Sequence, residues 1–289
     1  KRNKYIMNLI RGGIKAPVEG HKFCEADYGS LEVRVAACYT KDPVLIKYIL
    51  DESTDMHRDS ATDLFFMPTD KVSKMARFFA KNGFVFANFY GSSAKSAAKN
   101  LWKTLPEIFD VDNVPVFDYL AENDIYDYKD FEEHIIEIQE KFWKKFKVFK
   151  QWQLETVEEY KQNGFIESKH GFRRRGVLGY NEIINTKIQG SAFLFLLWSA
   201  IQVNSIRKKE CWKSKVIGQI HDSLLTSIDP EEERHVTQTI RYVMEEKVRE
   251  QYPWICVPMV AEFEITEPNG TWNTMKPIQV EYDKKFRRW

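Results

Sequence analysis

The chain has 289 residues, of which 43% are hydrophobic and 29% charged, and its formal net charge is +1. This length and composition exclude a disordered chain and predict one or two domains with a sizeable buried core. There is no run of about eighteen apolar residues, so we expect no membrane span and no membrane partner. Because the net charge is near zero, contacts with nucleic acid must come from local basic clusters.

The four cysteines include no pair with the close spacing of metal ligands. They are Cys24, Cys38, Cys211 and Cys256. This pattern predicts neither a zinc ribbon nor a disulfide scaffold, and it favours a reducing cytoplasm.

The first half of the chain is typical of one strand followed by several helices. Apolar periodicity predicts a strand over residues 21–27, a helix over 30–38 and a long helix from Asp70 to about residue 91. Asp42 and Asp55 are expected to be N-cap residues of two further helices. Residues 106–130 are acidic, aromatic and interrupted by prolines, which indicates loops and short helices.

The second half predicts hairpins between longer helices. The expected elements are helices over 130–146 and 149–162, a hairpin over 165–177, a helix over 181–207, a hairpin over 216–228, a helix over 231–250 and a strand over 259–265. The mixture of helices and antiparallel strands predicts an α+β fold.

Two aspartates stand at the ends of predicted strands. Asp27 follows the first strand at a turn into a helix, and Asp222 stands at the tip of the second hairpin, in Gln219-Ile220-His221-Asp222. Singly, such residues are most often caps or turn residues. Together they could meet across a sheet and hold divalent metal ions, because carboxylate oxygens suit Mg²⁺.

A basic and aromatic segment lies between the two aspartates. Arg77 and Lys81 are four residues apart and share one helix face, from which they can reach successive phosphates of a triphosphate. The aromatics of Phe86-Ala87-Asn88-Phe89-Tyr90 offer a stacking surface. The alternative interpretation is an amphipathic helix with two solvated cations.

These segments resemble a known family in their residues and in their order. The order Asp27-Tyr28-x-Ser30-x-Glu32-x-Arg34, then Arg77-x-x-x-Lys81 with Tyr90-Gly91, then Gln219-x-His221-Asp222 resembles motifs A, B and C of family A DNA polymerases, the bacterial DNA polymerase I type and its phage relatives. Asp55-Met56-His57-Arg58 resembles a fingers segment, and Asn185-x-x-x-Gln189-Gly190 resembles the start of a long palm helix. The similarity is collinear over nearly the whole chain, and residues 81–86 look phage-like.

The resemblance implies an α+β polymerase palm, an antiparallel sheet with helices, joined to helical fingers. Residues 1–50 would form the N-terminal part of the palm with motif A, residues 51–163 the fingers with motif B, and residues 164–289 the C-terminal part of the palm with motif C. The thumb and the 3′–5′ exonuclease domain are expected to be absent. The chain would then be a fragment, or one half of a split polymerase whose partner polypeptide carries a thumb and an exonuclease.

The resemblance also implies roles for individual residues. Two Mg²⁺ ions, for which Mn²⁺ can substitute, would be held by Asp27, Asp222 and the carbonyl of Tyr28, and Lys81 would be a further catalytic residue as the acid toward pyrophosphate. The residues expected to bind the incoming deoxynucleotide are His57, Arg77, Lys81, Phe86, Tyr90 and Glu32, the last as a steric gate against ribonucleotides. Those expected to contact primer–template DNA are Arg173, Arg174, Arg175, Asn185, Gln189, Gln219 and His221.

Three positions depart from the pattern of the family. Lys81 and Tyr90 are one residue further apart than usual, which would rotate the two halves of the helix by about 100° unless a π-bulge absorbs the extra residue. Ser223 stands where the family more often has glutamate, so we expect altered metal affinity rather than loss of activity. Asn181 replaces a common arginine, which predicts a weaker contact with DNA.

The resulting prediction is a template-directed DNA polymerase that adds deoxynucleotides to a primer 3′-hydroxyl by two-metal phosphoryl transfer. We expect it in the cytoplasm of a bacterium or of a phage-infected cell. A single-subunit RNA polymerase is disfavoured by Glu32, and a non-catalytic DNA-binding subunit of a replication complex is disfavoured by the intact pair of aspartates. A metal-dependent nuclease would leave Arg77, Lys81 and Tyr90 unexplained.

Overall fold

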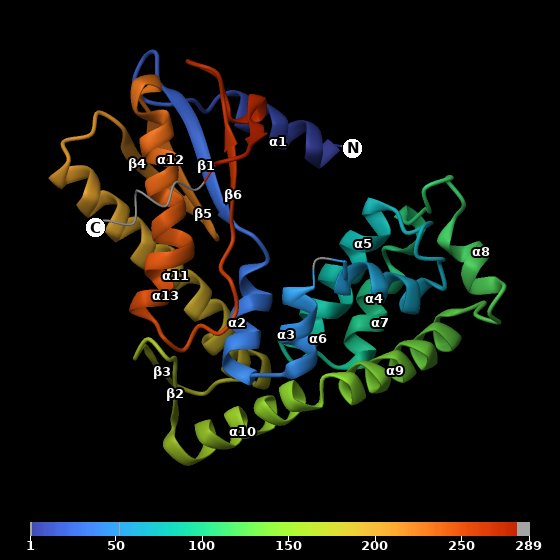
Figure 1. Cartoon of the computed structure of the whole chain (residues 1–289). Helices are drawn as coiled ribbons and strands as arrows, with labels where there is room; N and C mark the ends of the chain where they lie inside the picture. The colour runs from blue at the N-terminus through green and yellow to red at the C-terminus, as the bar shows by residue number, and fades with distance from the viewer. Residues whose placement is uncertain (1, 52, 282–289) are drawn as a thin grey trace. The chain divides into compact units, whose positions relative to one another are not determined.

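The structure, a computed structural model, describes residues 2–51 and 53–281, with the side chains of residues 6, 8–51 and 53–281 (Figure 1). The chain forms two compact units: unit 1 comprises residues 1–38 and 189–289, and unit 2 comprises residues 39–188. The chain passes from one unit to the other inside α2 (Leu31–Thr40) and again inside α11 (Tyr180–Lys209). The predicted boundaries at 50/51 and 163/164 both fall inside unit 2.

Unit 1 is built on an antiparallel sheet, which has five strands within the described residues, in the order β4-β5-β1-β6-β7. The strands are β1 (Lys22–Tyr28), β4 (Lys215–Ile220), β5 (Ser223–Ile228), β6 (Ala261–Ile265) and β7 (Lys276–Ile278). The first four confirm predicted strands. β7 was not predicted, because a strand of three residues with a central proline is too short to show an alternation of apolar and polar residues.

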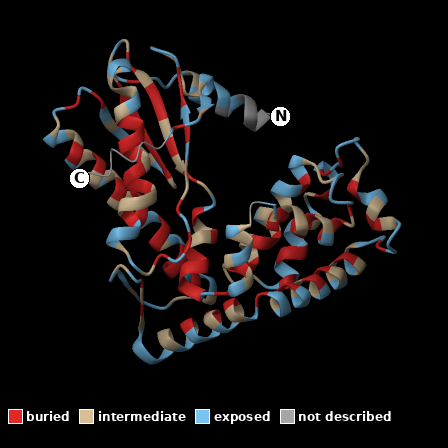
Figure 2. Cartoon of the chain, viewed as in Figure 1, coloured by how far each residue is buried: buried red, intermediate tan, exposed pale blue. Residues whose placement is uncertain are grey.

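The two faces of this sheet differ because successive side chains of β1 alternate between them. Tyr28 is buried on the helix-covered face, where its hydroxyl lies 3.0 Å from Ser199 Oγ of α11 and donates to the carbonyl of Met244 (2.8 Å). Figure 2 shows buried residues along β1, β5, α11 and α12 (Glu233–Tyr242). Asp27, the preceding residue, is only half-buried and belongs to the opposite face. One face therefore packs against the helices, and the other carries the acids together with a smaller buried cluster around Phe23.

The helices of unit 1 extend the predicted pattern. α12 continues through a π-helical turn (Val243–Lys247) into α13 (Val248–Gln251), which confirms a helical segment over 231–250. α1 (Arg2–Gly12) was not predicted. No helix within residues 2–51 and 53–281 is long and apolar enough to cross a membrane.

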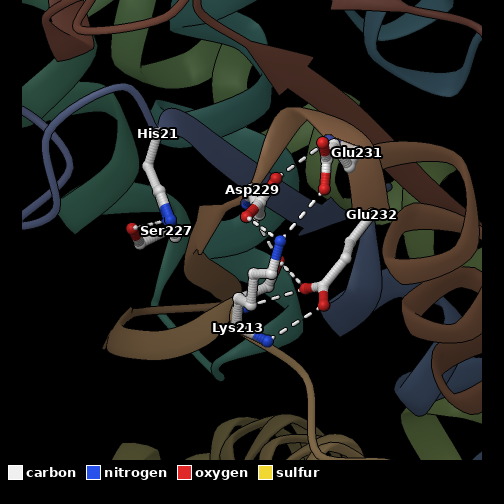
Figure 3. A network of polar contacts seen from close by, with 7 residues as sticks. His21, Lys213, Ser227, Asp229, Glu231 and Glu232 are labelled. Atoms are coloured by element: carbon white, nitrogen blue, oxygen red, sulfur yellow. Dashed lines mark hydrogen bonds and ion pairs between the residues drawn. The ribbon is translucent and has the colours of Figure 1, made fainter.

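A polar network closes the end of the sheet remote from Asp27 (Figure 3). His21 Nδ1 lies 3.0 Å from Ser227 Oγ, and Lys213 Nζ lies 3.0 Å from Glu231 Oε2 and 3.5 Å from Asp229 Oδ2. These contacts tie the loop after α11 to the turn before α12. The Lys213 side chain is exposed, so its ion pairs contribute little to stability. We therefore interpret this network as structural and not as part of a functional site.

Unit 2 is helical apart from one short hairpin. Its elements are α3 (Pro43–Leu50), α4 (Met56–Phe65), α5 (Lys74–Ala80), a π-helical turn (Lys81–Val85), α6 (Phe86–Phe89), α7 (Ala94–Trp102), α8 (Val116–Ala121), α9 (Tyr128–Lys145), α10 (Lys147–Asn163), β2 (Phe165–Glu167) and β3 (Arg173–Arg175). Asp42 and Asp55 are N-caps as predicted, each accepting hydrogen bonds from two backbone N–H groups. α7 was not predicted.

One predicted helix start is wrong. The long helix begins at Lys74 and not at Asp70, because the Ser73 hydroxyl accepts from the N–H of Ala76 and caps it. Lys71 instead closes a turn by donating its N–H to the carbonyl of Pro68 (2.8 Å). Proline at 68 favours such a turn, and a cap three residues further on competes with the aspartate.

Candidate active site

The structure brings Asp27 and Asp222 together on unit 1. Asp27 is the last residue but one of β1, and its register partner on β5 is Ser223. Asp222 is the second residue of the two-residue turn between β4 and β5, and its carbonyl accepts from the N–H of Tyr28 (3.2 Å). The first turn residue, His221, has a φ of 51°, which a two-residue hairpin turn requires. A tight turn and a central strand thus hold the two carboxylates side by side.

The carboxyl of Asp27 is strongly perturbed by this position. Burial raises its pKa to about 7, with further contributions from the charge of Asp222, that of Glu25, a hydrogen bond with Asp222 and the charge of Glu262. Two carboxyls that share a proton mark a site that lacks positive charge. A divalent cation that prefers oxygen ligands fits this site, because it would replace the proton and relieve the repulsion.

The donor set also suggests how such a cation would be coordinated. No group of three or more acidic, histidine or cysteine side chains suited to a metal occurs in the described part of the chain. Two carboxylates leave most of a magnesium coordination sphere open to water, to main-chain oxygens or to phosphate. The side chain of Tyr28 is buried in the core, so this residue can contribute only its main chain.

This perturbed acid predicts an unusual pH dependence of stability in the metal-free protein. The folded-state pKa of Asp27 lies above its ordinary value, so its contribution to stability is largest below about pH 4 and is lost as the pH rises to about 7. Asp27→Asn should therefore stabilise the folded state by about 1–2 kcal/mol at pH 8, after allowance for partial exposure, and raise the melting temperature. The gain should be smaller at pH 5, where Asp27 has lost only part of its contribution. Thermal unfolding with EDTA at both values measures this.

Asp51→Asn provides the matched control. Hydrogen bonds from Ser53 lower the pKa of Asp51, so this change should bring no gain at pH 8. An equal effect of Asp27→Asn at pH 5 and pH 8 would show that the pKa of Asp27 is not raised as described.

Sequence reasoning missed the acids on the neighbouring strand. Glu262 of β6 is the register partner of Asp27, and Glu264 is that of Glu25. Like charges directly opposite each other destabilise a sheet, so this arrangement works against the fold. The alternation of Ala-Glu-Phe-Glu-Ile already placed both glutamates on one face, but only strand pairing shows that this face also carries Asp27.

The other predicted residues of unit 1 lie on α2, α11, β4 and the hairpin turn. Glu32 is in the first turn of α2, and its Oε1 is 3.4 Å from Nε2 of Gln189. The residue expected to contact the nucleotide, Glu32, therefore lies beside a residue expected to contact DNA, Gln189. Gln219 lies on β4, and His221 is exposed in the hairpin turn. Ser223 is buried, and its hydroxyl donates to the carbonyl of Ile220 (3.0 Å) across the turn. Serine here thus fastens the turn that carries Asp222.

The predicted phosphate-binding residues lie together in unit 2. Arg77 Nε lies 2.6 Å from Asp55 Oδ2, which joins α5 to the N-cap of α4. His57 is buried in the first turn of α4, and burial, followed by the charges of Lys81 and Arg77, lowers its pKa to about 4. Its Nδ1 has no hydrogen-bond partner among the described residues. The cluster thus offers two cations and one neutral imidazole.

A π-helical turn absorbs the extra residue after Lys81, as predicted. It spans Lys81–Val85, and the N–H of Phe86 bonds to the carbonyl of Lys81. A β-carbon on Gly83 would come within 2.4 Å of Leu101, so the widened turn presses directly on α7. Lys81 Nζ lies 5.2 Å from the centre of the Phe86 ring, which lies 5.9 Å from that of Tyr90. The insertion therefore leaves the cation and the aromatics adjacent.

The motif-B helix ends in a tightly packed turn at Gly91. The N–H of Gly91 bonds to the carbonyl of Asn88, and that of Ser92 to the carbonyl of Ala87, which is a Schellman arrangement. Gly91 has a φ of 86°, and an added β-carbon would lie 2.3 Å from the ring of Tyr180. Sequence reasoning missed Tyr180.

Asn181 adds a polar contact to this turn. With its amide oriented to satisfy its neighbours, Asn181 donates to the carbonyls of Tyr90 (3.3 Å) and Gly91 (3.1 Å). Where the family often has arginine, this chain therefore uses the short amide to hold the end of the motif-B helix. These bonds hold the main chain of the turn that carries Tyr90.

Two of the three arginines of the β2–β3 hairpin form ion pairs with glutamates of unit 2. Arg173 Nε lies 2.5 Å from Glu167 Oε2, and Arg174 lies 2.6 Å from Glu182 Oε1. Arg175 is exposed at the end of β3, with its guanidinium 5.9 Å from the centre of the Phe165 ring. Asn185 is half-buried on α11, and its Oδ1 has no hydrogen-bond partner in the described ranges. Phosphate contacts from Arg173 and Arg174 must therefore compete with carboxylates.

Comparison with known proteins finds similarity over most of the chain. The model of DNA polymerase family A matches residues 2–110 and 130–272. DNA polymerase I of Aquifex aeolicus is 26% identical over 242 residues, which covers 83% of this chain and 38% of the relative. The DNA polymerase of Bacillus phage SP01 is 23% identical over 269 residues, covering 87% of this chain and 26% of the relative. The chain thus spans well under half the length of these relatives.

A solved structure shows the same fold. The POL domain of Pol1 from M. smegmatis, solved in complex with DNA primer-template and dNTP, has a TM-score of 0.68 at 21% sequence identity. The match covers 92% of this chain and 42% of that chain, and it confirms the α+β class. Since the family model covers most of the chain, including both aspartates and the motif-B helix, the chain belongs to DNA polymerase family A.

Proposed function

We propose that the chain catalyses template-directed addition of deoxynucleotides to the 3′-hydroxyl of a DNA primer. The observation that carries this proposal is the paired carboxyls of Asp27 and Asp222, held at the end of the central strand of unit 1 with too little positive charge around them. Membership of the family supports it, as does the likeness to a polymerase domain that was solved with primer-template and dNTP. In this proposal unit 1 is the palm and unit 2 the fingers.

The carboxylates would hold two Mg²⁺ ions, for which Mn²⁺ can substitute, with the carbonyl of Tyr28 as a further ligand. When bound, such ions lower the pKa of the primer hydroxyl and neutralise charge on the transferred phosphate. The 3′-oxygen forms a bond with the α-phosphorus as the bond from that phosphorus to the bridging oxygen breaks, and pyrophosphate leaves. The task of Asp27 and Asp222 is to stay ionised and fixed in place.

The fingers residues would bind the triphosphate. Arg77 and Lys81 would neutralise its phosphates, and Lys81 would give a proton to the leaving pyrophosphate. His57 is neutral at pH 7, because its pKa is about 4, so it would contribute a directed N–H donor rather than charge. Phe86 would contact the sugar, and Tyr90 would stack near the templating base.

The DNA contacts follow from the remaining residues. Arg173, Arg174 and Arg175 would bind phosphates, which gives salt-dependent affinity without sequence preference. His221 and Gln219 would approach the primer terminus, and Gln189 and Asn185 the terminal base pair and the template. The ion pairs of Arg173 and Arg174 would have to open on binding, so Arg175 should contribute most.

Primer extension tests the proposal directly. The chain and its Asp27→Ala variant are each incubated with primed DNA, Mg²⁺ and deoxynucleotides. Each is tested once alone and once with a polypeptide that carries the remaining part of a family relative. Metal-dependent extension that Asp27→Ala abolishes supports the proposal, and dependence on the added polypeptide would support a split enzyme. Binding of primed DNA without extension in either mixture would instead indicate a non-catalytic subunit, and shortening of the primer a nuclease.

Glu32 is proposed to exclude ribonucleotides. Its position in the first turn of α2, beside Gln189, is suited to crowding a ribose 2′-hydroxyl. Glu32→Ala should lower the preference for deoxynucleotides over ribonucleotides by about tenfold to a hundredfold, because discrimination by shape and polar contact is of this order. Single-nucleotide kcat/KM values for both substrates measure it. Glu264→Ala, an exposed acid of the same unit, is the control, and an unchanged ratio in Glu32→Ala would refute the assignment.

A further inference from the structure

The fold brings together two cysteines that the sequence keeps far apart. Cys38 Sγ and Cys256 Sγ are 3.9 Å apart although 218 positions separate them. Cys38 lies in α2, and Cys256 lies in the loop between α13 and β6. Both residues belong to unit 1. The two sulfurs are therefore in van der Waals contact within one compact unit.

The main chain around this pair is already fixed by other contacts. The N–H of Cys256 donates to Cys38 Sγ (3.4 Å), and Arg34 Nη1 of α2 donates to the carbonyl of Pro258 in the same loop (2.6 Å). Gly29 N–H, just before α2, bonds to the carbonyl of Val260 (2.9 Å). A disulfide needs sulfurs about 2.05 Å apart and α-carbons close enough for the bridge. The two sulfurs, now 3.9 Å apart, must therefore approach each other by about 1.9 Å.

The two thiols differ in their access to reagents. Cys256 is exposed, whereas Cys38 is buried, and burial raises the pKa of Cys38 to about 11. Because a thiolate and an open path are both needed for attack on an oxidant, Cys256 meets the oxidant first and Cys38 resolves the product. Of the other cysteines, Cys24 is buried within β1, and Cys211 is exposed after α11.

We propose that Cys38 and Cys256 form a reversible disulfide that fastens the end of α2 to the loop before β6. With hydrogen peroxide as the oxidant, the Cys256 sulfur bonds to one peroxide oxygen, the O–O bond breaks, and the other oxygen leaves as water after taking up the thiol proton. The Cys38 sulfur then attacks the sulfenic Cys256 sulfur, and the hydroxyl leaves as water with the Cys38 proton. A dithiol returns two electrons and two protons and restores both thiols.

The modification would act on the framework of the carboxylate site. α2 carries Glu32 in its first turn, and the loop leads into β6, where Glu262 faces Asp27. A covalent link across them closes a very long loop and so should stabilise the folded state. The inference rests on the geometry of unit 1 and does not depend on the proposed polymerase activity.

Thiol counting on the full chain tests the proposal. Cys211→Ser removes the other exposed thiol, leaving three cysteines. After hydrogen peroxide, denaturation and alkylation, we expect free thiols to fall from three to one, a linked Cys38–Cys256 peptide in mass spectrometry and a higher melting temperature. Dithiothreitol should restore all three thiols.

The matched control is Cys256→Ser in the same background, where both remaining thiols should survive the oxidant. This exposed position tolerates serine, so the control should fold. The proposal is overturned if the three thiols persist, if Cys256 accumulates as a sulfinic acid without a link, or if the linked peptide contains Cys24.

Discussion

Asp222→Asn is expected to lower primer extension by about 10³-fold or more at saturating Mg²⁺. The amide has the shape of the carboxylate, but it has no charge with which to hold a cation. Asp222 shares a hydrogen bond with Asp27, so both carboxylates act on one site, and the loss of either should remove most of the activity. Single-turnover extension measures the rate, and electron paramagnetic resonance of added Mn²⁺ measures binding, which should be lost in parallel.

The same substitution should not harm the fold. The charge of Asp222 helps to raise the pKa of Asp27, so its removal relieves a repulsion that the metal-free protein carries at pH 8. The melting temperature should then equal or exceed that of the unaltered chain, as expected where function has been kept at the expense of stability. Inactivity with a lowered melting temperature would instead point to misfolding. Glu264→Gln, on the same face of the sheet, should leave extension nearly unchanged.

Much of the fold could be predicted because its signals are local. The N-caps Asp42 and Asp55, the helix end at Gly164 and the hairpin around His221-Asp222 all rest on residues close in sequence. The predicted start at Asp70 was wrong because the Ser73 hydroxyl caps the helix three residues further on. The short strand β7 had no periodicity from which to predict it.

The sequence could nominate residues for the site but could not show their surroundings. Motif order led to the prediction of Asp27, Asp222 and the basic helix as site residues. The one-residue insertion pointed to a π-bulge as one way to keep the helix in phase, and the structure has a π-helical turn there. Long-range register was needed to see that Glu262 opposes Asp27. Packing was needed to see Tyr180 against Gly91. Both depend on contacts between segments far apart in the chain, where no local pattern reports them.

Gly91→Ala is expected to destabilise unit 2 by about 3 kcal/mol or more, the largest loss we expect from adding one methyl group. Two separate costs contribute. A φ of 86° is unfavourable for any residue with a β-carbon, and the new methyl would lie 2.3 Å from the Tyr180 ring. To make room, the ring or the turn must move, and the turn holds Tyr90 through its Schellman bonds and Asn181. Denaturant unfolding of the full chain measures the loss.

Two further variants separate the costs. Gly164→Ala has the same kind of backbone, with a φ of 70°, but nothing lies within 4 Å of its added methyl, so it should cost only about 1–2 kcal/mol. Tyr180→Ala removes the obstructing ring, so Gly91→Ala in that background should cost about as much as Gly164→Ala does alone. If the cost of Gly91→Ala does not fall there, the ring is not what excludes a side chain. If it does fall, glycine is required at this position by the packing of Tyr180, and any side chain added there would displace the turn that fixes Tyr90.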